Sequence, residues 1–360
     1  MPPSLPGLKT ETRIARLDGI RALAVLLVFA THVEILPLGW IGVQLFFVLS
    51  GLFITNILRR SRSEASYWPP FYIRRATRIL PPLAIAFLGA ALFSNIPWRQ
   101  VGFLEVFFLA NVAETLHRGQ TGTLGVLWSL AVEEQFYFAW PFAVRFLDRR
   151  HLLWLLTAIL IGEPILRAAA TPFCSTFWPI FFLTPFQLDG LAAGSLLALL
   201  LEDAQSAALI RRGSTWLFCA SALLFAAFSF LPQFHREANS ILFNSMGYSL
   251  INLCCCGLVA FVFSFESSPV SRVLAWPAVD FIGTISYGMY LFHPIILLLA
   301  DRAGTVLHFH HNRILAPLTL LALILVSWLS FRFYEQPLIS WGRKKASSLR
   351  RASQPAPVRP

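Results

Sequence analysis

The chain has 360 residues, of which 56% are hydrophobic and only 13% are charged, and its formal net charge is +11. Because soluble domains usually contain about 25% charged residues, this composition excludes an ordinary soluble protein and indicates one that crosses a membrane several times. The excess of positive charge is typical of cytoplasmic loops in membrane proteins, so we expect no nucleic-acid partner. The five cysteines lie in apolar runs without metal-ligand spacing, and we therefore expect no metal site.

Ten segments are apolar and long enough to cross a bilayer as helices, which takes about 20 residues each. In chain order they are 17–36, 39–58, 78–96, 126–147, 152–170, 178–201, 215–232, 243–265, 280–300 and 313–335. The segment 101–112 is apolar but short, which favours a re-entrant or interfacial position. The pattern predicts an all-α, polytopic membrane bundle of about ten transmembrane helices, without a soluble domain.

Lysine and arginine are distributed unequally between the two sides of this predicted bundle. Of the 29 such residues, only six lie in the loops of one side, namely Arg99, Arg118, Arg167, Arg236, Arg302 and Arg313. Positively charged loops remain in the cytoplasm, so we expect both termini there. The expected division is a cytoplasmic N-terminal segment at 1–16, a transmembrane domain at 17–341 and a basic, disordered cytoplasmic tail at 342–360.

The first predicted helix, LDGIRALAVLLVFATHV at 17–33, contains two ionisable residues that are costly in lipid, Arg21 and His32. Eleven positions separate them, which places both side chains on one face, about 16 Å apart along the helix axis. Arg21 then lies near the cytoplasmic boundary and His32 in the outer half of the bilayer. In the alternative interpretation, Arg21 snorkels to the interface and His32 is a hydrogen-bonded core residue.

The segment FYIRRATRILPP at 71–82 places Arg75 and Arg78 on one side of a helix at the cytoplasmic boundary. Guanidinium groups bind phosphate oxygens through two parallel hydrogen bonds, so this pair is a candidate phosphate site. The alternative is that both arginines only anchor the helix to anionic membrane lipids.

The segment LWSLAVEEQFYFAWP at 127–141 brings Ser129, Glu133 and Glu134 into the outer half of the bilayer, at the depth of His32. Consecutive helical residues point about 100° apart, so the two carboxylates cannot share one partner. A histidine beside a carboxylate can deprotonate a hydroxyl group. The same groups can also relay protons in a transporter.

The segment FIGTISYGMYLFHPI at 281–295 places Tyr287, Tyr290 and His293 on adjoining faces of one helix. Phenol groups inside a membrane need polar partners, so these residues are candidates to line a substrate-binding cavity. Asp189 is a further candidate for substrate binding, because it is an acidic residue within an apolar segment rich in small residues.

Six motifs occur in the order LDGIRALAVLLVFATH, GVQLFFVLSGLFI, FYIRRATRILP, LWSLAVEEQFYFAWP, ISYGMYLFHPI and FYEQP. They are spread over most of residues 16–340, and the chain resembles the integral-membrane acyltransferase-3 family, whose members O-acylate sugars and other hydroxyl acceptors. The resemblance implies a multi-pass protein of a bacterial inner membrane. It implies acyl-CoA as the donor, with acetyl as the default acyl group, and a saccharide or related hydroxyl compound as the acceptor. Some members carry a C-terminal hydrolase-like domain, which we do not expect in this chain.

The resemblance also gives individual residues an expected role. Family positions are matched by Arg21 and His32 (the arginine–histidine pair, His32 being the essential histidine), by Arg75 and Arg78 (the paired arginines) and by Glu133. The chain departs from the family at Gln187, where many relatives have an arginine before the aspartate.

These roles combine into one mechanistic hypothesis. The phosphates of coenzyme A rest on the arginines, and His32 is the general base that takes the proton of the acceptor hydroxyl. Glu133 or Glu134 orients the imidazole, while Ser129 or a tyrosine stabilises the oxyanion. A covalent acyl-histidine or acyl-serine intermediate remains an alternative.

A transporter or flippase of a lipid-linked saccharide is the alternative function, because the same ionisable residues can form a proton relay. Transporters are often built from inverted repeats, and no internal repeat is visible in this sequence.

Overall fold

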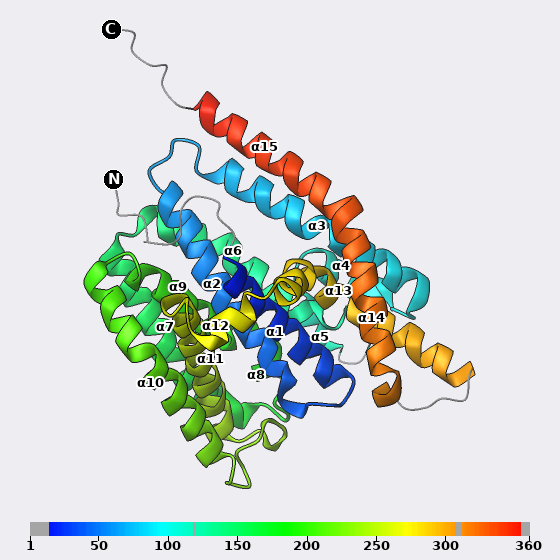
Figure 1. Cartoon of the computed structure of the whole chain (residues 1–360). Coiled ribbons are helices and arrows are strands. Elements are labelled where there is room, and N and C mark those ends of the chain that lie inside the picture. The colour runs from blue at the N-terminus through cyan, green and yellow to red at the C-terminus, as the bar shows by residue number, and fades with distance from the viewer. Residues whose placement is uncertain (1–13, 118–119, 307–311, 354–360) are drawn as a thin grey trace.

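The computed structural model describes residues 14–117, 120–306 and 312–353, and every regular element among them is helical (Figure 1). The α-helices are α1 (Ala15–His32), α2 (Ile41–Ser61), α3 (Trp68–Phe93), α4 (Trp98–Val106), α5 (Ala110–Leu116), α6 (Leu127–Phe146), α7 (Arg149–Ala170), α8 (Trp178–Phe182), α9 (Leu188–Leu200), α10 (Ala204–Phe228), α11 (Tyr248–Ser264), α12 (Pro269–Leu274), α13 (Pro277–Val306), α14 (Asn312–Ser330) and α15 (Gln336–Ala352). Short 3-10 turns connect several of them, and π-turns lie at Phe243–Gly247 and Phe331–Glu335. The prediction of an all-α bundle is confirmed.

Six helical stretches in the described part of the chain are long and apolar enough to cross a membrane. They are Pro37–Ser61, Trp68–Phe93, Arg149–Phe173, Phe243–Ser264, Pro277–Val306 and Leu315–Ala352. Helices α1 and α6 are of comparable length, with 18 and 20 residues, but they carry ionisable side chains that reduce their apolar character. The total of ten crossings and the side on which the termini lie remain predictions.

The predicted helix 178–201 is interrupted in the structure. A 3-10 turn at Thr184–Phe186 separates the short α8 from α9. Pro185 explains this interruption, because proline lacks a backbone N–H and its ring clashes with the preceding helical turn. Asp189 therefore lies in the first turn of a new helix rather than in the middle of a span.

The expectation of a disordered tail at 342–360 is wrong for its first part, which is helical in α15. Gly342 is buried against α3 so closely that an added Cβ atom would lie 2.2 Å from the Thr77 hydroxyl oxygen. Arg350 also forms an ion pair with Glu64, at 2.8 Å. These contacts offset the entropy cost of ordering a basic segment, so composition alone does not decide its state. The last seven residues lie outside the described part of the chain.

Helices α2 and α9 pack so closely that their backbones leave no room for a side chain at two glycines. A Cβ atom added to Gly51 would lie 2.0 Å from the carbonyl oxygen of Leu191, and one added to Gly194 would lie 1.9 Å from that of Val48. Small residues permit this approach, which is a common means of association between membrane helices. The contact fixes α2, another side of which lines a cavity.

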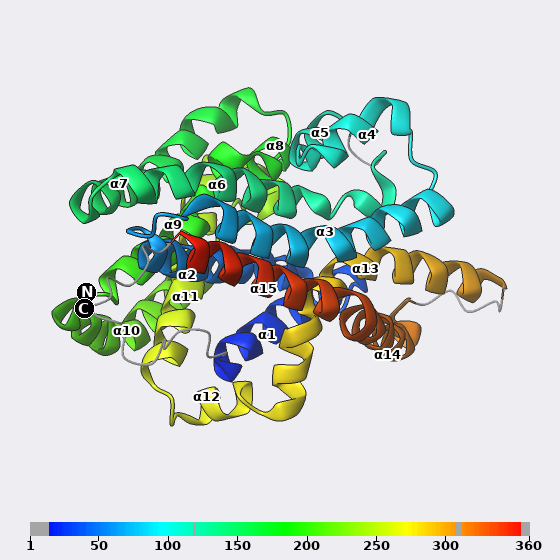
Figure 2. The same ribbon diagram turned by 90° about the horizontal axis from the view of Figure 1, so that it is seen from above.

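The helices around that cavity come from distant parts of the sequence. Helix α1 packs against α2 and α13, α3 packs against α13 and α15, and α6 packs against α2. Figure 2 shows α15 lying along α3. Side chains of these six helices line one common space.

Candidate active site

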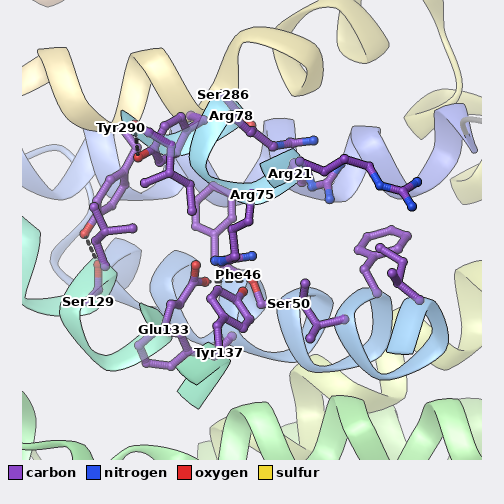
Figure 3. A pocket seen from close by; sticks show the side chains of 18 of the residues that line it. Arg21, Phe46, Ser50, Arg75, Arg78, Ser129, Glu133, Tyr137, Ser286 and Tyr290 are labelled. Carbon is purple, nitrogen blue, oxygen red and sulfur yellow. Dashed lines mark hydrogen bonds between the residues drawn. The ribbon is translucent and has the colours of Figure 1, made fainter. Parts of the chain in front are cut away.

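A cavity of about 410 Å³ lies between α1, α2, α3, α6, α13 and α15 (Figure 3). Its charged lining consists of five arginines and one glutamate, namely Arg21, Arg74, Arg75, Arg78, Arg343 and Glu133. Its hydroxyl groups are those of Ser50, Ser129, Tyr137, Ser286, Tyr287 and Tyr290. In Figure 3, Ser129 and Tyr290 lie at one end and Arg21 at the other. The cavity thus connects a cationic region with a region of hydroxyl groups.

Arg75 is held in place by α6. Its guanidinium donates to the Glu134 carboxylate from Nη2 at 2.7 Å and from Nε at 3.1 Å. The same group lies over the Tyr137 ring, with Cζ 3.0 Å from the ring centroid. Two parallel charge-assisted hydrogen bonds are among the stronger polar contacts in proteins. One edge of Arg75 is therefore committed to the protein, although the residue lines the cavity.

Glu133 points to a different neighbour, as expected for consecutive helical positions. Its Oε1 accepts a hydrogen bond of 2.7 Å from the Ser50 hydroxyl of α2. The two carboxylates face α2 and α3, so the expected role of Glu133 or Glu134 in orienting the His32 imidazole stays a prediction. In this structure Nδ1 of His32 lies 2.9 Å from the carbonyl oxygen of Val28.

Other arginines of the cavity are less constrained. Arg78 is exposed and, within the described residues, its guanidinium forms no hydrogen bond or ion pair. Arg343 of α15 is likewise exposed and has no such partner there. Arg21 is paired with Asp18 and lies 4.6 Å from the centroid of the Phe53 ring. The cationic region therefore offers two uncommitted guanidinium groups, the chemistry that suits phosphate oxygens.

The hydroxyl end of the cavity is a short hydrogen-bonded chain. The Tyr290 hydroxyl donates to the carbonyl oxygen of Val126 at 2.9 Å. The Ser129 hydroxyl lies 2.6 Å from that of Tyr290, a contact in which either oxygen can donate, and it also lies 3.3 Å from the Val126 carbonyl oxygen. Tyr287 also lines the cavity and donates to the carbonyl oxygen of Ile79, at 3.2 Å.

Two histidines lie in contact behind this hydroxyl end. The rings of His32 and His293 are edge to face, with centroids 4.6 Å apart. His293 is 1% exposed, and its ring centroid is 5.7 Å from that of Tyr290. His32 is exposed at the last turn of α1. Neither histidine lines the cavity itself, so His293 lies between the cavity and the expected catalytic histidine.

Asp189 is not among the residues that line the cavity, and its expected role in substrate binding stays a prediction. It accepts a 2.7 Å hydrogen bond from Nη2 of Arg167, which is fully buried, and another of 2.7 Å from Asn252. Glu163 is the second carboxylate on the same guanidinium, at 3.3 Å. A buried aspartate needs a paired charge and hydrogen bonds. Gln187, where many relatives have an arginine, accepts a hydrogen bond from the side chain of Gln44.

The comparison with known protein families decides the identity of this bundle. A family model described as an acyltransferase domain matches residues 14–332. The chain belongs to this acyltransferase family. The resemblance seen in the sequence motifs is thereby confirmed, whereas the alternative of a transporter is not favoured.

Two relatives of this acyltransferase-family chain are bacterial proteins. The peptidoglycan O-acetyltransferase OatA of Listeria monocytogenes is 30% identical over 92% of this chain and 57% of its own length. The O-acetyltransferase OatA of Staphylococcus aureus is 25% identical over 91% of this chain and 57% of its own length. The chain therefore spans somewhat more than half of these relatives. No solved structure matches it. The apolar helices and these relatives identify a multi-pass bacterial membrane protein.

Several cavity residues were not found from the sequence of this acyltransferase-family chain. Ser50 is a polar residue within an apolar run, and Tyr137 lies four residues after Glu133, on the same helical face. Both features could have indicated that these residues belong to the site. Arg343 lies beyond residue 332, where the family match ends, and had been assigned to the tail. Within the described residues, no group of three or more histidine, cysteine or acidic side chains is arranged to hold a metal ion.

Proposed function

We propose that this protein is a membrane-bound O-acyltransferase that moves an acetyl group from acetyl-CoA to a hydroxyl of a cell-wall saccharide. The observation that carries the proposal is that one cavity has five arginines in its lining and the Ser129–Tyr290 hydroxyl pair at its far end. An acyl-CoA has the matching form, with phosphates at one end of a thin arm and a thioester at the other.

The arginine region suits the donor nucleotide. Arg78 and Arg343 have uncommitted guanidinium groups, and Arg21 and Arg75 add positive charge beside them. Charge-assisted hydrogen bonds to phosphate contribute about 1.5–3 kcal/mol each. The positive-inside bias supports a position of this region at the cytoplasmic boundary, where acyl-CoA is available.

The chemical step follows from the histidine that the family motif supplies. Because Nδ1 of His32 donates to Val28, Nε2 carries the lone pair and is the basic nitrogen. It takes the proton of the acceptor hydroxyl as that oxygen attacks the thioester carbonyl; the C–O bond forms and the C–S bond breaks. The Ser129 hydroxyl lines the cavity, and it stabilises the developing oxyanion once its proton turns from its partners in the protein toward the substrate.

The acceptor class is inferred from two observations. The relatives named above are a peptidoglycan O-acetyltransferase and an O-acetyltransferase. His32 is exposed at the end of α1, which lets an acceptor outside the cavity reach it. We therefore infer that the acceptor is a hydroxyl of a peptidoglycan sugar or a related surface saccharide.

The test uses the purified chain in lipid vesicles with radiolabelled acetyl-CoA and soluble peptidoglycan fragments. We expect label on the saccharide that mild base releases, as for an ester. Heat-treated protein and fragments lacking free sugar hydroxyls are the controls. Passage of saccharide across the vesicle without labelling would contradict the proposal and support transport instead.

A further inference from the structure

We propose that Glu133 determines donor specificity: its carboxylate accepts a hydrogen bond from the amide N–H of the acyl-CoA arm that lies nearest the thioester sulfur. This inference rests on the proposed acyl transfer and assigns a further residue to the same cavity. It begins with the charges of the lining. Among the described residues, Glu133 is the only acidic side chain of the cavity, beside five arginines.

The charge of Glu133 does not suit the phosphate end of the donor. Like charges repel, so a carboxylate beside a phosphate weakens binding. An ionised carboxylate has acceptor oxygens and no proton to donate, so its partner in a ligand is an N–H or O–H group. The arm of coenzyme A between the phosphates and the sulfur carries two amide N–H groups and a hydroxyl. Glu133 therefore suits the arm rather than the nucleotide.

The position of Glu133 agrees with a contact to the arm. In Figure 3 it lies between Ser129, at one end of the cavity, and Arg21, at the other. Ser129 and Glu133 are four residues apart on α6, so their side chains share one face and lie about 6 Å apart along the helix axis. Both line the cavity, so a thin ligand that runs along α6 passes one and then the other.

This spacing matches the structure of a coenzyme A thioester. With the thioester carbonyl beside Ser129, as proposed above, the sulfur and two methylene groups separate the carbonyl carbon from the nearest amide nitrogen. In an extended arm that segment spans about 5 Å at ordinary bond lengths, close to the rise of about 6 Å from Ser129 to Glu133. The second amide lies further along the arm, toward the arginines. The geometry thus selects the amide nearest the sulfur.

The protein holds the Glu133 carboxylate and leaves it acceptor capacity. The Ser50 hydroxyl of α2 donates to Oε1 at 2.7 Å, and the Tyr137 hydroxyl interacts with the same carboxylate. A carboxylate offers about four lone-pair positions, so these contacts leave room for a further donor. The adjacent Glu134 is committed instead to the Arg75 guanidinium, through Nη2 and Nε.

Other roles of Glu133 predict a different result. If Glu133 were a general base, its loss would lower kcat for every donor by the same factor, about 100-fold or more. If Glu133 only packed the bundle, its loss would also affect all donors equally. Recognition of one amide instead changes the preference between donors that differ only in that N–H.

The experiment measures kcat/KM for acetyl-CoA and for two synthetic analogues, in each of which one amide N–H is replaced by an ester oxygen. The near analogue carries the ester at the amide nearest the sulfur, and the far analogue carries it at the other amide. We expect the purified wild type to prefer acetyl-CoA to the near analogue by about 10- to 100-fold, as for a charge-assisted hydrogen bond.

The variants show whether this preference belongs to Glu133. Glu133→Met should abolish it, whereas Glu133→Gln, whose amide oxygen still accepts, should keep about 2- to 10-fold. The preference for acetyl-CoA over the far analogue should be the same in all three proteins. Glu266→Met is the matched control and should behave like the wild type, since this carboxylate is 63% exposed and pairs with Arg16 outside the cavity.

Two results would overturn the proposal. One is a wild type that uses acetyl-CoA and the near analogue equally well; the other is an undiminished preference in Glu133→Met. If Glu133→Met does not fold, Glu133→Gln decides, because the full wild-type preference in that variant would equally overturn the contact. A wild type that transfers no acetyl group from acetyl-CoA would instead refute the acyl-transfer proposal on which this inference rests.

Discussion

The guanidinium of Arg75 on α3 is clamped to the carboxylate of Glu134 on α6, with Nη2 2.7 Å from Oε1. The two side chains are 15% and 16% exposed, so the pair is shielded from most solvent. It joins the arginine helix to the helix that carries Ser129 and Glu133. The pair therefore sets the geometry between the two ends of the cavity.

Replacing either partner of this pair should destabilise the protein more than replacing both. Arg75→Met leaves the Glu134 carboxylate without its cation, and Glu134→Met leaves the Arg75 guanidinium without its anion. The double variant leaves no unpaired charge at this position. We expect a coupling free energy of about 1–3 kcal/mol from a double-mutant cycle of unfolding in detergent. Simple additivity of the two single effects would show that the pair is not an energetic link.

Arg78→Ala should weaken acetyl-CoA binding. Loss of a charge-assisted contact to phosphate is worth about 1.5–3 kcal/mol, so KM for acetyl-CoA should rise by about 10- to 100-fold. The KM for the saccharide should change little. Arg212→Ala is the control, because it removes the same charge from an exposed position on α10. An equal rise of this KM in both variants would show that Arg78 acts only through the overall charge of the protein.

Arg343 tests whether α15 belongs to the donor site. It lines the cavity from a helix that lies beyond the family match at 14–332. Arg343→Ala should raise the KM for acetyl-CoA, by about 10-fold for one charge-assisted contact. The neighbouring Lys344→Ala, exposed and not part of the cavity lining, should leave that KM unchanged. If both variants behave like the wild type, α15 takes no part in donor binding.

Gly51→Ala should lower the stability of the bundle severely. The added methyl group would lie 2.0 Å from the Leu191 carbonyl oxygen, so α2 and α9 must separate. Overpacking of this kind typically costs about 1–3 kcal/mol or more. Gly213→Ala on α10 is the matched control: nothing lies within 4 Å of its added Cβ atom, and alanine favours a helix by about 0.5–1 kcal/mol. Thermal midpoints that fall equally for both would contradict the close helix packing.

The sequence predicted which residues share one helix better than it predicted which residues of different helices are in contact. Arg21 and His32 are on α1, and Tyr287, Tyr290 and His293 are on α13, because helical periodicity is a property of a single segment. The spacing of residues within such a segment, together with their order along the chain, was enough to indicate the family.

Partners across helices were not predictable in the same way. Periodicity shows that Glu133 and Glu134 face apart, but not that α3 brings Arg75 to one of them. Likewise nothing in the local sequence pairs Asp189 with Arg167. Such choices depend on which helices are neighbours, and therefore on packing.

Two errors had visible causes. Hydropathy concealed the helix break at Pro185, although proline is the strongest local signal against a continuous helix. Basic composition suggested disorder after residue 342, but contacts with α3 order that segment as far as α15 extends.

The most direct test is the rate of acetyl transfer from radiolabelled acetyl-CoA by purified His32→Asn. This substitution keeps an amide donor for the Val28 carbonyl and removes only the basic nitrogen. We expect kcat to fall by about 100-fold or more, with unchanged membrane insertion and KM for acetyl-CoA. Transfer at the wild-type rate would contradict a general base at His32 and the mechanism of acyl transfer proposed for it.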